Sequence, residues 1–99
     1  MARVIWSPQA LADLEAIGDY LAREAPAYAQ AFVDGAFDAV KQLELFPRSG
    51  RAVPEIRDVA LREVIYRGYR IFHIVSERDT GIEVDILSVF HSTRQFGAE

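Results

Sequence analysis

The sequence predicts one two-layer α+β domain, in which an antiparallel helix hairpin packs on one face of an antiparallel β-sheet in the order β-α-α-β-β-β. Three observations support this fold class. Two stretches in the first half place apolar residues at helical spacing, and three stretches in the second half are rich in β-branched and aromatic residues. The length of 99 residues suits a single domain spanning residues 1–99.

The first strand is expected at residues 3–6, which are β-prone, and the first helix directly after it. Ser7 can accept hydrogen bonds from the first helical N–H groups, and Pro8 suits the first helical position. Apolar side chains then recur at helical spacing, which predicts a helix to about residue 23 or 24, at Leu11, Leu14, Ile17 and Leu21.

A second helix is predicted from Pro26 to just before Pro47, and the short Ala25-Pro26 connection makes the two helices antiparallel. Gly35 is either a weak point of this helix or a place where another element comes close. The apolar surface covers more than half of the helix, so it is either deeply buried or covered by a partner. Its main stripe comprises Tyr28, Phe32, Ala36, Ala39, Leu43 and Phe46.

The sheet is built around a predicted hairpin whose arms are residues 59–66 and 69–76. Gly68 can adopt the positive φ of a two-residue turn, but Arg67 suits the first turn position less well than Asn or Asp, so a slightly longer loop is the alternative. With that turn Tyr66 pairs with Tyr69 and Arg62 pairs with His73, so that Arg62 and Arg70 point to opposite faces. Residues 82–90 form the last strand of a three-stranded meander, and the N-terminal strand joins an edge of the sheet.

The composition restricts the class of function. There is no cysteine, which excludes disulfides and thiolate metal sites, and no signal peptide or run of about 18–20 apolar residues, so a cytoplasmic protein is expected. The net charge of −4 argues against an extended nucleic-acid footprint. Charge is distributed unevenly, because residues 13–38 are mostly acidic whereas eight of the eleven basic residues fall between residues 48 and 94.

Candidate chemistry centres on the hairpin and the end of the last strand, where Arg62, Arg70, His91 and Arg94 could converge. Arginine and histidine together suit binding or cleavage of a phosphodiester. In the alternative interpretation the arginines cover a sheet face and pair with acidic residues of neighbouring strands, at Glu63, Glu83 or Asp85. Phosphate-binding glycine motifs are absent, and with two histidines neither a metal nor another cofactor is expected; His73 is interpreted as a satisfied core or surface residue.

An ordered set of short motifs covers almost the whole chain. It comprises Ser-Pro-x-Ala-x-x-Asp-Leu at residues 7–14, Phe-Pro-Arg-Ser-Gly-Arg at 46–51, Val-Pro-Glu at 53–55, Leu-Arg-Glu-Val-Ile-Tyr-Arg-Gly-Tyr-Arg-Ile at 61–71, and Val-Phe-His at 89–91 followed by Arg94. This set resembles the ParE branch of the RelE/ParE superfamily, the toxins of bacterial type II toxin–antitoxin pairs. The resemblance implies a compact toxin that is neutralised by a ParD-like antitoxin. It also implies that ParE-like members act on DNA gyrase, whereas RelE-like members cleave messenger RNA on the ribosome.

The resemblance also assigns residues. A ribonuclease would use Arg62, Arg70 and His91, but Val64 replaces a second base, and Phe96 stands where a tyrosine is expected. We therefore expect a gyrase inhibitor without enzymatic activity, with the ribonuclease and a non-toxic antitoxin-binding member as alternatives. The expected target-binding residues are Arg70, His91, Arg94 and Phe96, and the expected antitoxin-binding residues are Leu14, Ile17, Phe37 and Val40. The acidic charge departs from many relatives, which tend to be basic, so apolar grooves beside the helices are expected to carry more of the antitoxin contact.

Overall fold

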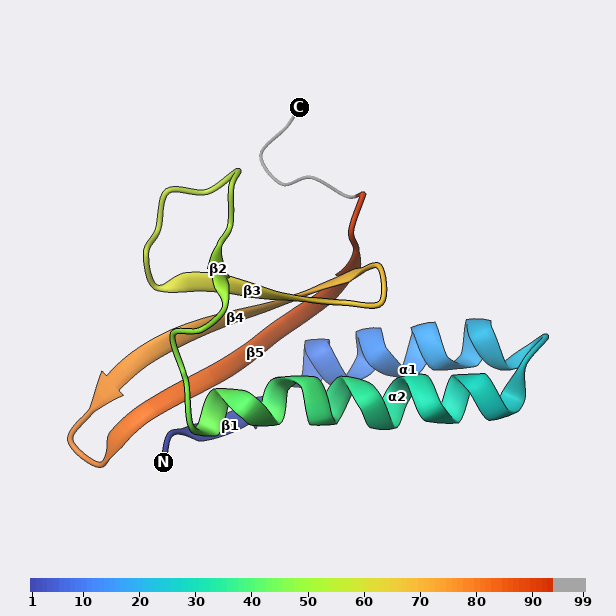
Figure 1. The fold of residues 1–99 in the computed structure, drawn as a ribbon, viewed down its shortest axis with the longest axis horizontal. Coiled ribbons are helices and arrows are strands. Elements are labelled where there is room, and N and C mark those ends of the chain that lie inside the picture. Colours follow the sequence, from blue (N-terminus) through green and yellow to red (C-terminus); the bar gives the residue numbers. More distant parts are fainter. Residues whose placement is uncertain (94–99) are drawn as a thin grey trace.

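The computed structural model, which describes residues 1–93, has two helices on one side of a twisted five-stranded sheet (Figure 1). This arrangement confirms the predicted two-layer α+β fold. The elements in chain order are β1 (Arg3–Trp6), α1 (Pro8–Ala22), α2 (Pro26–Lys41), the short 3₁₀ helix η1 (Gln42–Glu44), β2 (Arg51–Ala52), β3 (Leu61–Tyr66), β4 (Tyr69–Arg78) and β5 (Gly81–His91).

The strands lie in the order β1-β5-β4-β3-β2. As predicted, β3, β4 and β5 form an antiparallel meander, and β1 joins an edge. However, β1 runs parallel to β5, so the sheet is mixed rather than purely antiparallel. Parallel neighbours need a long crossover connection. Here the helix pair and strands β2 to β4 provide that connection. The residue types in β1 do not show whether it runs parallel or antiparallel to its neighbour.

The register of the central hairpin agrees with the prediction: Tyr66 pairs with Tyr69 and Arg62 pairs with His73. Both turn residues, Arg67 and Gly68, have positive φ, as the favoured two-residue turn requires. Arg67 accepts this conformation although it has a Cβ atom. Its guanidinium lies 5.9 Å from the ring centre of Tyr28 and 5.7 Å from that of Tyr66, which favours a cation at this position.

Capping and close packing join the helices to the sheet. The Ser7 hydroxyl accepts a hydrogen bond from the Ala10 N–H and donates one to the Leu87 carbonyl, so it caps α1 and ties it to β5. A Cβ atom at Gly35 would collide with the Tyr66 hydroxyl, which donates to the Phe32 carbonyl at 2.9 Å. Gly35 is therefore a site of close approach between α2 and β3.

The core fills the space between the helices and the inner face of the sheet. Its larger cluster joins Val40 and Leu43 to strand residues including Ile71 and Ile86, and a smaller cluster comprises Leu14, Phe32 and Ala36. Among residues 1–93, neither helix has the length and continuous apolar character needed to cross a membrane.

Candidate functional site

Strand alternation separates two of the three arginines that the sequence singled out. Arg62 shares the inner, helix-facing side with Val64 and Tyr66, whereas Arg70 shares the outer side with Glu63. The Arg62 Nη1 donates to the Gly50 carbonyl at 2.9 Å, so it is engaged with the loop that precedes β2. The two guanidinium groups therefore serve different faces of the sheet.

Arg70 is the centre of a buried ion-pair network on the outer face. It is only 3% exposed, and its Nε donates to Glu63, which is 1% exposed, at 2.6 Å. Its two terminal nitrogens donate to the two carboxylate oxygens of Glu55 at 2.7 and 2.8 Å. Arg51 donates from Nε to the second oxygen of Glu63 at 2.5 Å. The hydrogen bonds from Arg70 to Glu55 and Glu63 raise the pKa of Arg70, so the guanidinium is firmly charged.

This network confirms for Arg70 the interpretation that the arginines pair with nearby carboxylates such as Glu63. Glu55 was not identified as a partner, because the pair spans 15 residues across an irregular segment that no periodicity describes. The one signal for Glu55 was its position in the Val-Pro-Glu motif at residues 53–55. Functionally, the network fixes the loop before β3 onto the sheet.

His73 occupies a buried position on the inner face. It is 0% exposed, and neither of its ring nitrogens has a hydrogen-bond partner among residues 1–93. A Cβ atom at Gly50 would come within 2.8 Å of the His73 Cε1, so that glycine packs directly on the ring. Burial lowers the pKa of His73, the backbone of Ile71 opposes this shift without meeting hydrogen-bond geometry, and the positive charge of Arg62 lowers the pKa further. The position agrees with a core histidine, but its polar atoms are not satisfied by the described chain.

His91 is the last residue of β5; it is exposed and pairs with Tyr69, next to the turn between β3 and β4. Its Nδ1 lies 2.8 Å from the Thr93 hydroxyl, and its ring centre lies 5.4 Å from that of Tyr69. His91 pairs with Tyr69 and Arg62 pairs with His73, so the Arg62 and His91 positions are four residues apart along β4. At about 3.3 Å per residue this separates them by about 13 Å. The structure therefore does not bring Arg62, Arg70 and His91 into one site.

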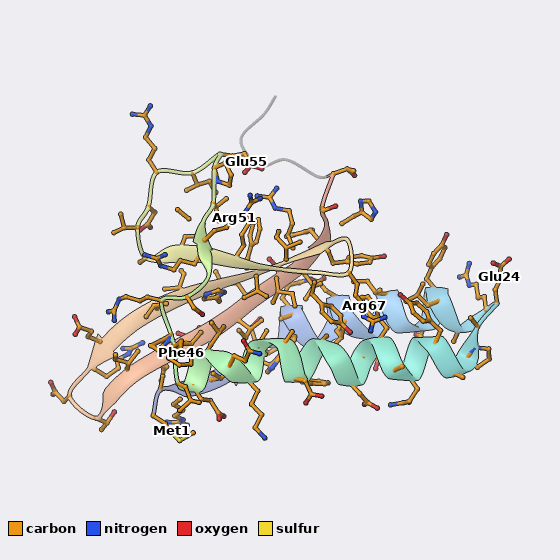
Figure 2. All side chains as sticks on the ribbon, viewed as in Figure 1. Met1, Glu24, Phe46, Arg51, Glu55 and Arg67 are labelled. Carbon is orange, nitrogen blue, oxygen red and sulfur yellow. The ribbon has the colours of Figure 1, made fainter. Side chains whose placement is uncertain are left out.

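Figure 2 shows how side chains of both faces are distributed over the fold, with Arg51 and Glu55 on the loop side of the sheet and Arg67 at the hairpin tip above α2. Arg94 and Phe96 lie outside the described residues. Within residues 1–93, no group of three or more histidine, aspartate and glutamate side chains is arranged to hold a metal ion.

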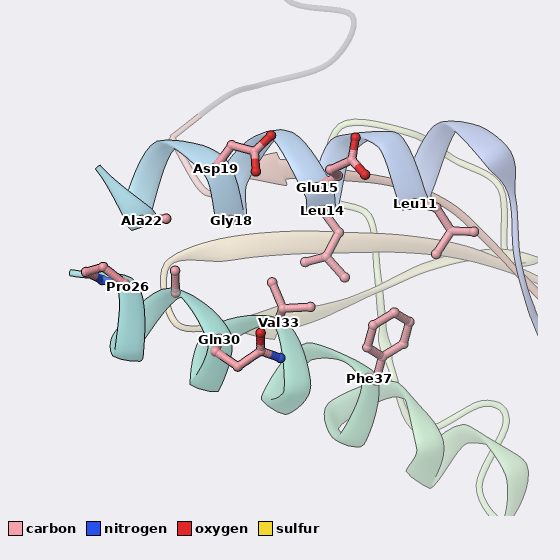
Figure 3. Close-up of a pocket in the computed structure, with 11 residues that line it drawn as sticks. Leu11, Leu14, Glu15, Gly18, Asp19, Ala22, Pro26, Gln30, Val33 and Phe37 are labelled. Carbon is pink, nitrogen blue, oxygen red and sulfur yellow. The ribbon is translucent and has the colours of Figure 1, made fainter. Parts of the chain in front are cut away.

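The helices form a groove of about 410 Å³ on their outer surface (Figure 3). Leu14 and Val33 point toward each other at its floor, and Phe37, which is 39% exposed, lies at one end. Gly18 allows the helices to approach, because a Cβ there would lie 3.1 Å from Val33 Cγ2. Glu15 and Asp19 of α1 also line the groove.

The four residues expected to bind an antitoxin thus have different environments. Phe37 is exposed in the groove, and Leu14 lines it although the core buries most of that side chain. Ile17 is half-buried against both core clusters, and Val40 is 1% exposed. The free chain consequently offers a partner far more of Phe37 than of Val40.

Comparison with known proteins identifies the family. Residues 4–96 match the model of the ParE toxin of the type II toxin–antitoxin system parDE. The chain belongs to the ParE toxin family. It is also 35% identical over 95 residues to Toxin RelE2 of Caulobacter vibrioides, covering 95% of this chain and 99% of that protein. This toxin therefore belongs to the RelE/ParE superfamily, as its motifs indicated.

Solved structures of related toxins have the same fold. The chromosomal ParDE toxin–antitoxin system of P. aeruginosa superposes with a TM-score of 0.74 at 24% identity, covering 92% of this toxin and 96% of that chain. The RelBE2 toxin–antitoxin complex of Mycobacterium tuberculosis superposes with a TM-score of 0.55 at 25% identity, covering 91% and 96%. The helix hairpin and the sheet are thus shared with both of these solved structures, so the fold alone does not decide what this toxin acts on.

Proposed function

We propose that this ParE-family toxin inhibits DNA gyrase in the cytoplasm and performs no chemistry of its own. The family match supports the gyrase branch. The single observation that carries the proposal is the separation of Arg62, Arg70 and His91, two of which lie about 13 Å apart along β4 while the third is on the opposite sheet face. General acid–base catalysis requires such groups within about 3 Å of the same reacting atoms.

The proposed target-binding surface is the end of β5 together with the residues that follow it. His91 is exposed there, and Arg94 and Phe96 come next in the chain. Arg70 was also expected in this surface, but its guanidinium is buried on the outer face of the sheet, so its proposed role is indirect: its ion pairs hold that face in place. A histidine, an arginine and an aromatic ring are suited to contact a protein surface.

A supercoiling assay with purified gyrase tests this proposal. The toxin, freed of antitoxin, is expected to block supercoiling and to leave RNA intact. His91→Ala should require roughly tenfold more protein for half inhibition, equivalent to about 1.4 kcal/mol. Glu77→Gln, an exposed change at the other end of the β4–β5 hairpin, is the matched control. Unchanged supercoiling at saturating wild-type toxin contradicts the proposal.

We further propose that the antitoxin covers the helix groove through Phe37 and Leu14, with Ile17 and Val40 supporting those side chains from the core. A partly exposed aromatic ring beside an apolar floor is a favourable anchor site. Hydrogen exchange should slow in α1 and α2 when the antitoxin is bound. If each helix is protected from exchange to the same extent in the free and the bound toxin, the antitoxin does not contact the helix groove.

A second candidate function is ribosome-dependent cleavage of messenger RNA. Two observations favour it: the curated relative is named RelE2, and His91 is exposed at the end of the last strand. Induction should then create new transcript ends within codons, detectable by primer extension. Full toxicity of both Arg70→Ala and His91→Ala would eliminate this candidate. A family member that only binds its antitoxin is the remaining alternative, and unaltered growth on induction would indicate it.

A further inference from the structure

The groove between α1 and α2 combines an apolar floor with acidic side chains. Leu14 and Val33 form the floor, and Leu11 and Phe37 leave large apolar surfaces exposed at one end (Figure 3). Glu15 and Asp19 are exposed, and the residues that line the groove include no lysine or arginine. Any occupant must therefore match both an apolar strip and negative charge.

We propose that this groove receives an amphipathic antitoxin segment that places lysine or arginine beside its apolar side chains. The inference rests on the proposed antitoxin partner and adds the chemistry of the segment that binds. The cationic groups would lie against Glu15 and Asp19, and the apolar groups against Leu14, Val33 and Phe37.

The charge of the helix hairpin supports this choice. Residues 8–41 contain six acidic and two basic side chains, a net charge of −4, which equals the formal charge of the whole chain. The remaining residues are therefore neutral in total, and the negative potential originates from the helices. A positively charged segment is attracted toward such a surface, whereas a negatively charged segment is repelled from it.

Glu15 and Asp19 are also poorly placed for the isolated toxin. They are four residues apart on α1, a spacing at which like charges repel each other, and Arg23, one turn beyond Asp19, forms no ion pair with it among the described residues. Among the described residues neither carboxylate takes part in an ion pair. By contrast, Asp13 accepts hydrogen bonds from Gln9 and from the Val89 N–H. A cationic partner would offset the repulsion between Glu15 and Asp19.

The same charge disfavours other occupants. Nucleic acid and anionic lipid would bring further negative charge to an acidic groove. A second toxin docking through the same face would bring two copies of this acidic surface together, because a two-fold interface uses the same patch on both copies. The length of α1, 15 residues, corresponds to about 22 Å and accommodates a helical segment of about four turns.

The test measures affinity between full-length toxin and the purified product of the reading frame adjacent to its gene, by calorimetry at low and high salt. Reversal of both groove charges in Glu15→Lys with Asp19→Lys should weaken binding at least tenfold at low salt, and weaken it less at high salt. The control, Glu77→Lys with Asp79→Lys, makes the same charge change at the exposed β4–β5 turn and should alter affinity less than twofold.

A charge swap provides the second measurement. Lysine or arginine residues of the bound segment, changed to glutamate, should restore affinity for the groove variant and weaken binding to wild-type toxin. Circular dichroism verifies that each variant is folded. If the groove variant binds as tightly as the control variant, the inference is wrong while the antitoxin partner stands. If wild-type toxin does not bind at all, both the proposed partner and the inference fail.

Discussion

The helix groove and the outer face of the sheet use charged side chains in opposite ways. On the sheet, Arg70 and Glu63 are buried and joined by hydrogen bonds of the protein itself. In the groove, Glu15 and Asp19 are exposed and held by no ion pair within residues 1–93. A buried charge must be paired in the free protein because its desolvation is expensive, whereas an exposed charge can remain available for a partner. The sheet network therefore maintains the fold, and the groove is the better candidate for recognition.

Replacing Arg70 should cause the largest loss of stability among these variants. Arg70→Met leaves Glu63 buried and deprives Glu55 of both of its hydrogen bonds from Arg70, so we expect a loss of about 3–5 kcal/mol in the free energy of unfolding. Urea denaturation measures it. Arg51→Met removes an exposed member of the same network and should cost about 1 kcal/mol or less. Equal losses in the two variants would show that burial does not distinguish these arginines.

Two glycines, one in each region, provide the next comparison. Gly50→Ala would push a methyl group against the His73 ring and the backbone carbonyl of Glu63, which should cost about 1–3 kcal/mol. Gly18→Ala meets only the tip of Val33, and the better helix propensity of alanine, about 1 kcal/mol, should offset that contact. Thermal unfolding of both variants is the measurement. If Gly18→Ala lost more stability than Gly50→Ala, the helix groove and not the sheet side would be the more tightly packed region.

A smaller effect is expected from pH. The folded chain resists protonation of His73 because burial lowers its pKa, whereas the unfolded chain binds that proton near its usual pKa of about 6.5. The unfolded state then holds more protons, so stability is full above about pH 6.5 and decreases as the pH falls below it. His73→Leu should flatten this decrease between about pH 7.5 and 5.5.

Urea denaturation at a series of pH values detects the change, and His91→Gln, which replaces a histidine on the surface, is the control for loss of a histidine outside the core. An identical pH profile for wild-type and His73→Leu protein would show that His73 does not couple protonation to folding. That result would weaken the contrast between a desolvated sheet interior and a solvated groove.

The smallest effect on stability is expected in the groove itself. Neutralising Glu15→Gln with Asp19→Asn removes two exposed charges and should change the free energy of unfolding by no more than about 0.5 kcal/mol, with a slight gain from relieving repulsion. Chemical denaturation of the free toxin measures it. A loss above 1 kcal/mol would mean that these carboxylates support the fold and are not available for recognition.

The candidate site was only partly predictable. Alternation in the hairpin placed Arg62 and Arg70 on opposite faces as soon as the two-residue turn was assumed, and the register confirms it. The Arg70–Glu55 pair was not predictable, because its partners lie on a regular strand and in an irregular loop. The groove could not be predicted without the packed helices, since Gly18 and Val33 come together only when α1 packs against α2.

The sequence by itself determined the order of the two helices and of strands β1, β3, β4 and β5, the helix starts near Pro8 and Pro26 and the acidic character of the helix hairpin, because these depend on neighbouring residues and local chemistry. It did not predict the short strand β2, and it left a longer loop open beside the two-residue turn at Arg67 and Gly68. Tertiary structure alone decided the parallel pairing of β1 with β5, the burial of Arg70 and the assignment of Gly35 to a close contact with Tyr66. These features depend on which distant segments meet, and that is fixed by packing the two apolar surfaces against each other.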